Sequence, residues 1–351
     1  MTTTSLPDSN GSFLSTTSAN SRSSDAIAPI PFVMHAIISY IIAAGGFIAN
    51  STIIIVILLS RSLRSTNMFM LFCNLATADF LLAVTIPFTG TIMLNKGYFY
   101  YGLFLCKAIP VIQTTVIIVS ALTLVVVSID RSLAIAKPFF FERWCSTKAI
   151  GLVISLIWIF SFTFASPQIH FLTLTPYQYC YIRMQAQSSI TYLISGMIIQ
   201  FFMPLVSGIV SYIVIGKVLR KLNQLPIHLQ PNAHQLCYAK RRAKTAFIVL
   251  LVYILSSIGF YTLLFMDVAL RTRFKQDPSL YFIMANISFV FRMIAYSSSV
   301  WNPFIYMASS PSFRQSIKSI KFTSTIIPIR RTSTLFIIRD SGGCMRKTST
   351  K

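Results

Sequence analysis

Residues 67–94 read NMFMLFCNLATADFLLAVTIPFTGTIML, an apolar run whose single charged side chain is Asp79. A helix crosses the hydrocarbon core of a membrane with roughly 20 mostly apolar residues, so this run is long enough to span it. Six further runs of this kind lie at 32–60, 103–136, 148–171, 189–220, 240–268 and 280–307. Because unpaired backbone groups are not tolerated in lipid, each run is expected to be helical. The sequence therefore predicts an all-α integral membrane protein, a bundle of seven transmembrane helices over residues 32–307.

The composition agrees with lipid as the solvent of most of the surface. Of the 351 residues, 54% are hydrophobic and only 11% are charged, whereas a soluble domain carries about 25% charged residues. The formal net charge of +22 would indicate nucleic acid if the basic residues formed one patch on a soluble fold. They lie instead in short clusters between the apolar runs, so nucleic acid is not an expected partner.

The basic clusters also predict the orientation, because cytoplasmic loops carry an excess of Lys and Arg. With the N-terminus outside the cell, most of the 30 Lys and Arg residues fall on the cytoplasmic side. We therefore expect a protein of the plasma membrane with an extracellular N-terminus and a cytoplasmic C-terminus.

The two ends of the chain are expected to be tails. Residues 1–31 are rich in Ser and Thr and should form a disordered extracellular tail, with a glycosylation acceptor at Asn10. Residues 308–322 read as a short amphipathic eighth helix on the membrane surface, with Phe313 and Ile317 on one side. A frayed helical stub is the alternative. Residues 323–351 should form a cytoplasmic tail.

Polar residues recur about once in each apolar run, where they are costly and usually functional. In chain order they are Asn50, Asn74 to Asp79, Ser128-Ile129-Asp130-Arg131, Trp158, Pro204 with Tyr212, and Asn302-Pro303-Phe304-Ile305-Tyr306. From residue 32 to about residue 322 this order and spacing resemble the rhodopsin-like G-protein-coupled receptors. The resemblance implies a receptor rather than an enzyme. It also implies a heterotrimeric G protein, arrestin and receptor kinases as partners, besides membrane lipid.

The resemblance assigns roles to residues at the cytoplasmic end. In such receptors the arginine that corresponds to Arg131 leaves the acid beside it, here Asp130, on activation. It then helps to form the G-protein pocket with the residues that correspond to Tyr212 and Tyr306. Pro303 has no amide donor and should loosen its helix at the preceding residue, Asn302, as a moving cytoplasmic end requires.

Asp79 is the one carboxylate deep in a predicted membrane helix, so its charge needs partners, a bound cation or a proton. The resemblance places a polar cluster around Asp79, in which such receptors hold sodium. The cluster consists of Asn50, Ser120, Ser299 and Asn302. A water-filled hydrogen-bonded network without ion affinity is the alternative. No other cofactor is expected.

The six cysteines divide by the side of the membrane on which they lie. Cys106 and Cys180 fall in extracellular segments, where disulfides persist. The resemblance pairs these two, which would tether the second outer loop to the third helix.

Residues toward the outer side indicate the class of ligand. Amine receptors of this family carry an Asp seven residues after the outer cysteine of the third helix, and Gln113 stands there instead. Gln113, Pro87 and the run Ala295-Tyr296-Ser297-Ser298-Ser299 resemble neuropeptide receptors of the somatostatin, opioid and galanin group. Tyrosines in the outer loops also suit peptide contacts. An extracellular peptide is therefore the expected ligand.

The expected ligand contacts are Gln113, Ser257, Tyr261, Asp267, Arg292 and Tyr296. Arg292 lies about 15 Å along its helix from Asn302, near the outer mouth of the bundle, where Asp267 could reach it. Either these two residues pair and brace two helices, or Arg292 receives a ligand carboxylate while Asp267 takes a basic side chain. A small anion or a lipid acid is the alternative ligand. A seven-span channel or transporter is the alternative class of protein.

The sixth run departs from the pattern that it resembles. Receptors of this kind carry Phe-x-x-Cys-Trp-x-Pro, whereas residues 253–259 read YILSSIG. Ser257 thus replaces the tryptophan, and Gly259 replaces the proline that bends the helix, although glycine also permits a bend. No acid occurs between Glu142 and Asp267. The resting position of the sixth helix must therefore depend on packing and hydrogen bonds, and a ligand-independent or decoy role is the alternative to a ligand-operated receptor.

Overall fold

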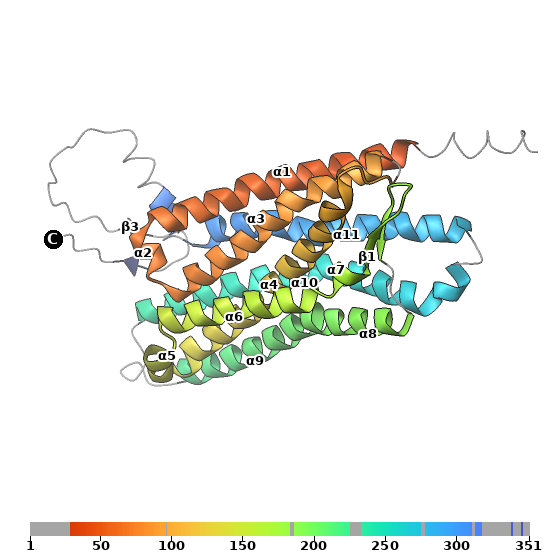
Figure 1. Cartoon of the computed structure of the whole chain (residues 1–351). Helices are drawn as coiled ribbons and strands as arrows, with labels where there is room; N and C mark the ends of the chain where they lie inside the picture. Colours follow the sequence, from red (N-terminus) through yellow and green to blue (C-terminus); the bar gives the residue numbers. More distant parts are fainter. Residues whose placement is uncertain are drawn as a thin grey trace, which may run out of the picture.

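The computed structural model describes residues 29–95, 97–182, 186–224, 233–274, 278–310, 313–317, 338–339 and 345–346. Its long helices lie side by side in one bundle (Figure 1). They are α1 (Pro29–Leu59), α3 (Asn67–Leu94), α4 (Gly102–Ala136), α6 (Thr147–Ala165), α8 (Ala186–Met197), α9 (Met203–Asn223), α10 (Ala233–Phe274) and α11 (Pro278–Ser309). A π-helical turn, η1 (Ile198–Phe202), joins α8 to α9, so that together they form the fifth of seven spans. The prediction of a seven-helix bundle is confirmed.

Short elements close the two ends of the bundle. The helices α2 (Arg61–Arg64) and α5 (Pro138–Trp144) lie at one end, and α7 (Gln168–Phe171) lies toward the other (Figure 1). There the strands β1 (Leu172–Leu174) and β2 (Cys180–Ile182) form an antiparallel hairpin, with Leu174 opposite Cys180. A second antiparallel pair, β3 (Ile338–Arg339) and β4 (Met345–Arg346), belongs to the C-terminal tail.

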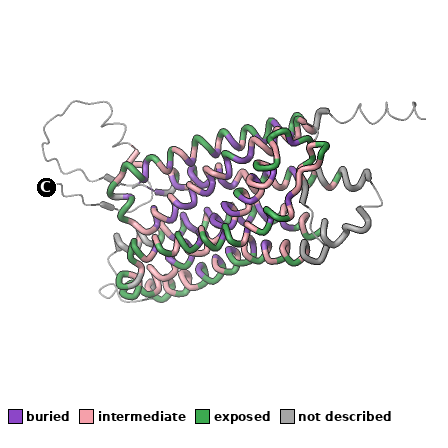
Figure 2. The backbone as a smooth tube through the Cα atoms, in the orientation of Figure 1, coloured by how far each residue is buried: buried purple, intermediate pink, exposed green. Residues whose placement is uncertain are grey.

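The outside of the bundle is apolar, as lipid requires. Within the described residues, 6 helices are long and apolar enough to cross a membrane, and α11 packs beside α1 and α10 to complete the bundle. Ile41, Leu152 and Leu255 are 66%, 63% and 62% exposed, and exposed positions follow the outer faces of the helices (Figure 2). An apolar surface of this extent marks a membrane interface.

The fourth span is interrupted near its end, where sequence predicted a continuous helix over 148–171. Helix α6 ends at Ala165 because Pro167 has no amide to bond to the carbonyl of Thr163. The hydroxyl of Ser166 donates to that carbonyl at 3.0 Å instead. After this turn the chain continues as α7, so the span bends before it reaches the hairpin.

The segment expected on the membrane surface is described in part. Residues 313–317 are helical, and 318–322 lie outside the described residues. Phe313 is 1% exposed, and its ring stacks at 6.5 Å on that of Phe69 in α3. The apolar side of this turn therefore packs against the bundle. Residues 1–28, with Asn10 among them, and most of residues 323–351 lie outside the described residues.

Candidate functional site

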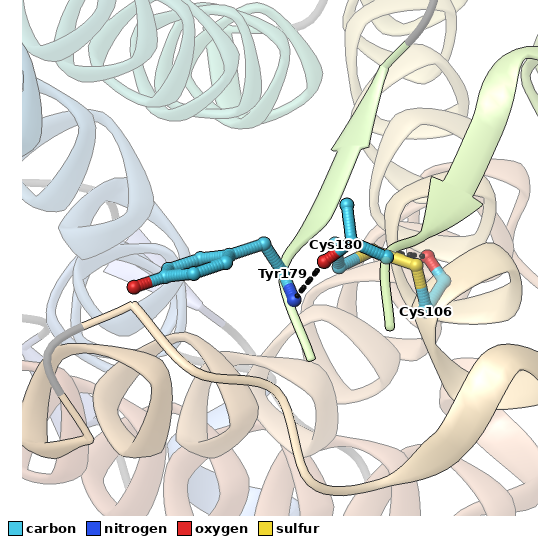
Figure 3. Close-up of a disulfide and its surroundings, with 4 residues drawn as sticks. Cys106, Tyr179 and Cys180 are labelled. Atoms are coloured by element: carbon cyan, nitrogen blue, oxygen red, sulfur yellow. Dashed lines mark hydrogen bonds between the residues drawn. A yellow bond between two sulfur atoms is a disulfide. The ribbon is translucent and has the colours of Figure 1, made fainter. Parts of the chain in front are cut away.

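The disulfide between Cys106 and Cys180 is present, with 5.7 Å between the two Cα atoms. It ties β2 to the N-terminal end of α4, and the ring of Tyr179 points away from it (Figure 3). Phe99 is 2% exposed and packs beside Cys106 and Ile109. The predicted tether is therefore confirmed, and it fixes the outer hairpin over one side of the bundle.

Tyrosines gather at the outer surface next to this hairpin. The ring of Tyr98 lies 4.8 Å from that of Tyr179 and 6.1 Å from that of Tyr100. All three side chains are exposed. A hydrogen bond with Tyr98 raises the pKa of the Tyr179 hydroxyl, so the hydroxyl stays protonated at neutral pH. The cluster therefore offers uncharged aromatic faces and hydroxyls to a ligand.

Deeper in the bundle, Asp79 joins three helices. Its carboxylate accepts from Asn302 Nδ2 at 2.8 Å and from Ser120 Oγ at 3.4 Å. Asn50 donates to the carbonyls of Gly46 and Ser299, at 2.8 and 3.0 Å. Of the predicted cluster, Ser120 and Asn302 thus bond to Asp79, whereas Asn50 and Ser299 bond to each other through the Ser299 backbone.

The side-chain atoms of this cluster that have no hydrogen-bond partner are oxygens, which accept hydrogen bonds. Asn50 Oδ1 and Asn302 Oδ1 are buried and have no hydrogen-bond partner, and Asp79 is 4% exposed. Buried oxygens of carboxylate and amide groups are the ligands that hard cations prefer. The residues present therefore fit a sodium ion. The described residues hold no cluster of His, Cys, Asp and Glu that would suit a transition metal.

A second set of hydrogen bonds between helices was not predicted from the sequence, although Asn74 and Trp158 were both singled out there. Asn74 on α3 donates to Thr123 Oγ1 on α4 at 2.8 Å. Its amide oxygen accepts from Trp158 Nε1 on α6, also at 2.8 Å. The sequence gives no sign of Thr123, because a threonine in an apolar helix usually bonds to its own backbone.

At the end of the bundle that is expected to face the cytoplasm, Arg131 is paired with the adjacent Asp130, to which its Nε donates at 2.9 Å. Both side chains are buried. Tyr306 stacks at 4.1 Å on Phe72 of α3, and Tyr212 is 62% exposed and stacks at 5.0 Å on Phe247 of α10. Neither tyrosine is hydrogen-bonded to Arg131, whose partner is Asp130, although Tyr212 and Arg131 line the same cavity.

A cavity of about 290 Å³ opens beside this pair, between α4, α9 and α10. Its polar lining comes from Ser128, Arg131, Ser211, Tyr212, Lys240 and Lys244, and its apolar lining includes Ile215, Leu219, Phe247 and Leu250. Ser211 Oγ donates to the carbonyl of Ser128 at 2.8 Å and fixes α9 against α4 at its wall. The cavity therefore combines an apolar wall with positive charge.

The expected ligand contacts come from three helices. Gln113 lies on α4, Ser257 and Tyr261 on α10, and Arg292 and Tyr296 on α11. Gln113 Nε2 and Arg292 Nε are buried without a partner, and the guanidinium of Arg292 lies 5.7 Å from the centre of the Phe260 ring. The side chain of Asp267 lies outside the described residues, so its pairing with Arg292 stays a prediction.

Gly259 leaves room for a side chain of the neighbouring helix α11. Helix α10 continues through this glycine from Ala233 to Phe274, and a methyl group at Gly259 would overlap the ring of Phe291 on α11. Gly208 on α9 is similar, since a methyl group there would overlap the side chain of Leu250. Gly259 therefore allows α11 to approach the backbone of α10 closely, and Gly208 allows α10 to approach the backbone of α9 closely.

Sequence similarity identifies relatives of the whole membrane domain. A family model described as 7 transmembrane receptor (rhodopsin family) matches residues 49–306. The QRFP-like peptide receptor of Branchiostoma floridae is 26% identical over 298 residues, which cover 81% of this chain and 76% of the relative. The human neuropeptide Y receptor type 2 is 28% identical over 296 residues, with 78% and 72% covered. The mouse substance-K receptor is 26% identical over 277 residues, with 77% and 70% covered.

Proposed function

Because the chain belongs to the rhodopsin family of seven-transmembrane receptors, we propose that it binds an extracellular peptide and promotes nucleotide exchange on a heterotrimeric G protein. The observation that carries this proposal is the buried Asp130–Arg131 pair at the wall of the cytoplasmic cavity. A buried ion pair adds little stability, because desolvation offsets most of its attraction. A role in switching, in which Arg131 exchanges Asp130 for another partner, explains why the chain has such a pair.

In the proposed cycle, Arg131 leaves Asp130 when the cytoplasmic end of α10 moves outward. The cavity between α4, α9 and α10 then widens and admits a segment of the G protein. Its apolar wall suits an apolar face of that segment, while Lys240 and Lys244 suit acidic groups on it. Arrestin, receptor kinases and membrane lipid are proposed as further partners of the same basic face and of the cytoplasmic tail.

A peptide is supported as the ligand by the names of the relatives, which are receptors for peptides. The outer tyrosines supply aromatic area, and Gln113 and Arg292 supply donors that no described acceptor satisfies. A ligand that presents a carbonyl or carboxylate oxygen would satisfy both of these donors. An anionic ligand is the second candidate, favoured by the unpartnered Nε of Arg292.

The sodium ion belongs to the same proposal. Asp79 and the free oxygens of Asn50 and Asn302 would hold it, and its charge would stabilise the resting packing of α3, α4 and α11. The orientation, with the N-terminus outside, is proposed on the distribution of basic residues. Glycosylation of Asn10 is proposed on its Asn-Gly-Ser triplet in that outer tail.

Screening secreted peptides against cells that express the chain tests this function, with dissociation of the G protein as the readout. The expected result is a peptide that elicits dissociation through the intact chain and not through Arg131→Ala. Measuring the flux of ions or solutes through proteoliposomes that contain the protein distinguishes a receptor from a channel or transporter. Ion or solute flux without any G-protein response would overturn the proposal.

A further inference from the structure

The fifth span contains a backbone carbonyl that its own helix does not use in the regular way. In an α-helix the amide of residue 204 bonds to the carbonyl of residue 200. Residue 204 is Pro204, which has no amide hydrogen, and η1 widens the helix at the same place. The carbonyl of Gln200 therefore needs another donor, because buried carbonyls are nearly always bonded.

Helix α10 supplies that donor. The hydroxyl of Tyr253 donates to the Gln200 carbonyl at 2.7 Å, and Tyr253 is 7% exposed. Two turns further out, the hydroxyl of Tyr261 donates to Gln200 Oε1 at 2.8 Å. One residue of the fifth span thus holds two tyrosines of α10, one through its backbone and the other through its side chain.

The Tyr253 hydroxyl is an addition to the pattern that this chain resembles. The resembling receptors carry phenylalanine at this position, and a phenylalanine cannot donate to Gln200. The chain also lacks the tryptophan at Ser257, and Arg131 pairs with Asp130 on its own helix rather than with α10. Leu250, one turn before Tyr253, seats against the backbone of α9 at Gly208. Tyr253 therefore lies one turn from a close contact between α9 and α10.

We propose that the Tyr253–Gln200 hydrogen bond is a latch that holds α10 in its resting position, and that the Tyr261 bond links this latch to the ligand pocket. A hydrogen bond is lost once its donor and acceptor separate by more than a few tenths of an ångström beyond 3.2 Å. Outward movement of α10 must therefore break it. A ligand that takes the Gln200 side chain from Tyr261 weakens the hold on the same helix. Tyr253 is a positioning residue, and this role rests on the proposed receptor function.

The full-length receptor in lipid nanodiscs tests the latch without ligand or G protein. Spin labels on unnatural amino acids at Arg61 and Lys244, both exposed, report the distance from α2 to the cytoplasmic end of α10. Tyr253→Phe keeps the ring and removes only the hydroxyl. We expect the ratio of outward to resting α10 to rise about threefold to fivefold, the change that about 0.6–1 kcal/mol produces.

A matched control removes a comparable hydroxyl elsewhere. Tyr192 on α8 accepts from Gln168 Nε2 at 2.6 Å and donates to the Phe164 carbonyl at 3.3 Å, neither of which lies on α10. Tyr192→Phe should lower thermal stability and leave the distance distribution unchanged. If both variants open α10 equally, or if Tyr253→Phe leaves the distribution at wild type, the latch does not exist.

Gln200→Ala separates the latch from its link to the pocket. This variant removes Oε1, the acceptor of Tyr261, and keeps the carbonyl that holds Tyr253. Its ratio of outward to resting α10 should rise by clearly less than that of Tyr253→Phe, because the bond to the backbone carbonyl remains. Opening as large as that of Tyr253→Phe would show that the backbone carbonyl is not the anchor. Because these distances need no signalling, failure of the latch is distinguishable from failure of G-protein coupling.

Discussion

Single polar side chains join the helices of this bundle at several depths. Asn74 bonds to α4 and α6, Asp79 bonds to α4 and α11, and Asn50 bonds to the backbone of α11. Helices in lipid gain no hydrophobic stabilisation by meeting one another, so close packing and hydrogen bonds such as these fix which faces meet. The remaining free atoms of Asn50 and Asn302 are both acceptors, which is the reason to expect a cation.

Asp79→Asn should abolish the effect of sodium on the receptor, because an amide cannot offset the charge of a cation. We expect sodium chloride to raise the melting midpoint of the purified wild type by about 2–4 °C over choline chloride, as binding to the folded state alone requires. The variant should show no difference. A wild type that ignores sodium would favour the water-filled network instead.

Arg292→Ala should weaken a ligand that ends in a free carboxylate by well over tenfold, because removing one partner of a desolvated charge pair costs about 2–5 kcal/mol. Competition binding with matched free-acid and amidated peptides measures this loss. Amidating the carboxylate of the peptide should weaken its binding to the wild type as much as Arg292→Ala does. Testing the amidated peptide on Arg292→Ala should lower the affinity little further. Equal binding of both peptide forms to the wild type would rule out the carboxylate contact.

Helix α10 packs closely against both of its neighbours at a glycine: Gly259 faces Phe291 of α11, and Gly208 of α9 faces Leu250 of α10. Gly259→Ala should destabilise the receptor by about 1–3 kcal/mol, because the new methyl group overlaps Phe291 and a packed core does not absorb it. Thermal melting measures the loss, which Phe291→Leu should partly restore in the double variant. Gly151→Ala on α6 is the matched control, since nothing lies within 4 Å of its added methyl group. A Gly259→Ala variant as stable as the control would return the glycine to a hinge role.

The hairpin between α7 and α8 depends on its disulfide rather than on lipid. Cys180→Ser should therefore abolish most ligand binding while leaving the amount of membrane-inserted receptor near wild type, because the spans insert by hydropathy. Radioligand or fluorescent-peptide binding and quantification of inserted protein measure the two effects. Loss of insertion in proportion to binding would mean that the bridge is needed for folding as a whole.

Across the whole molecule, the sequence predicts those features that depend on the residues of a single helix. Apolar length gives most of the spans to within about three residues, apart from the break that Pro167 introduces before α7. Helix α10 is the other exception, because it begins 7 residues before and ends 6 residues after the predicted run 240–268. Motif residues such as Asp79, Arg131 and Asn302 were found because polar groups in lipid are costly. Gln200 and Thr123 were not, because their roles arise between helices. The partners of Gln200 are separated from it by 53 and 61 residues, and no local pattern records such a distance.

Nucleotide exchange on purified heterotrimeric G proteins tests the central claim most directly. The receptor in nanodiscs should accelerate exchange on at least one heterotrimer of a panel above the receptor-free rate, without ligand. The reason is that residues 233–266 of α10 contain no acid that could hold Arg131 through a salt bridge. Arg131→Ala should remove this acceleration, whereas Lys148→Ala, an exposed cytoplasmic control on α6, should keep it. No acceleration with any heterotrimer, or equal rates for wild type and Arg131→Ala, would contradict the account.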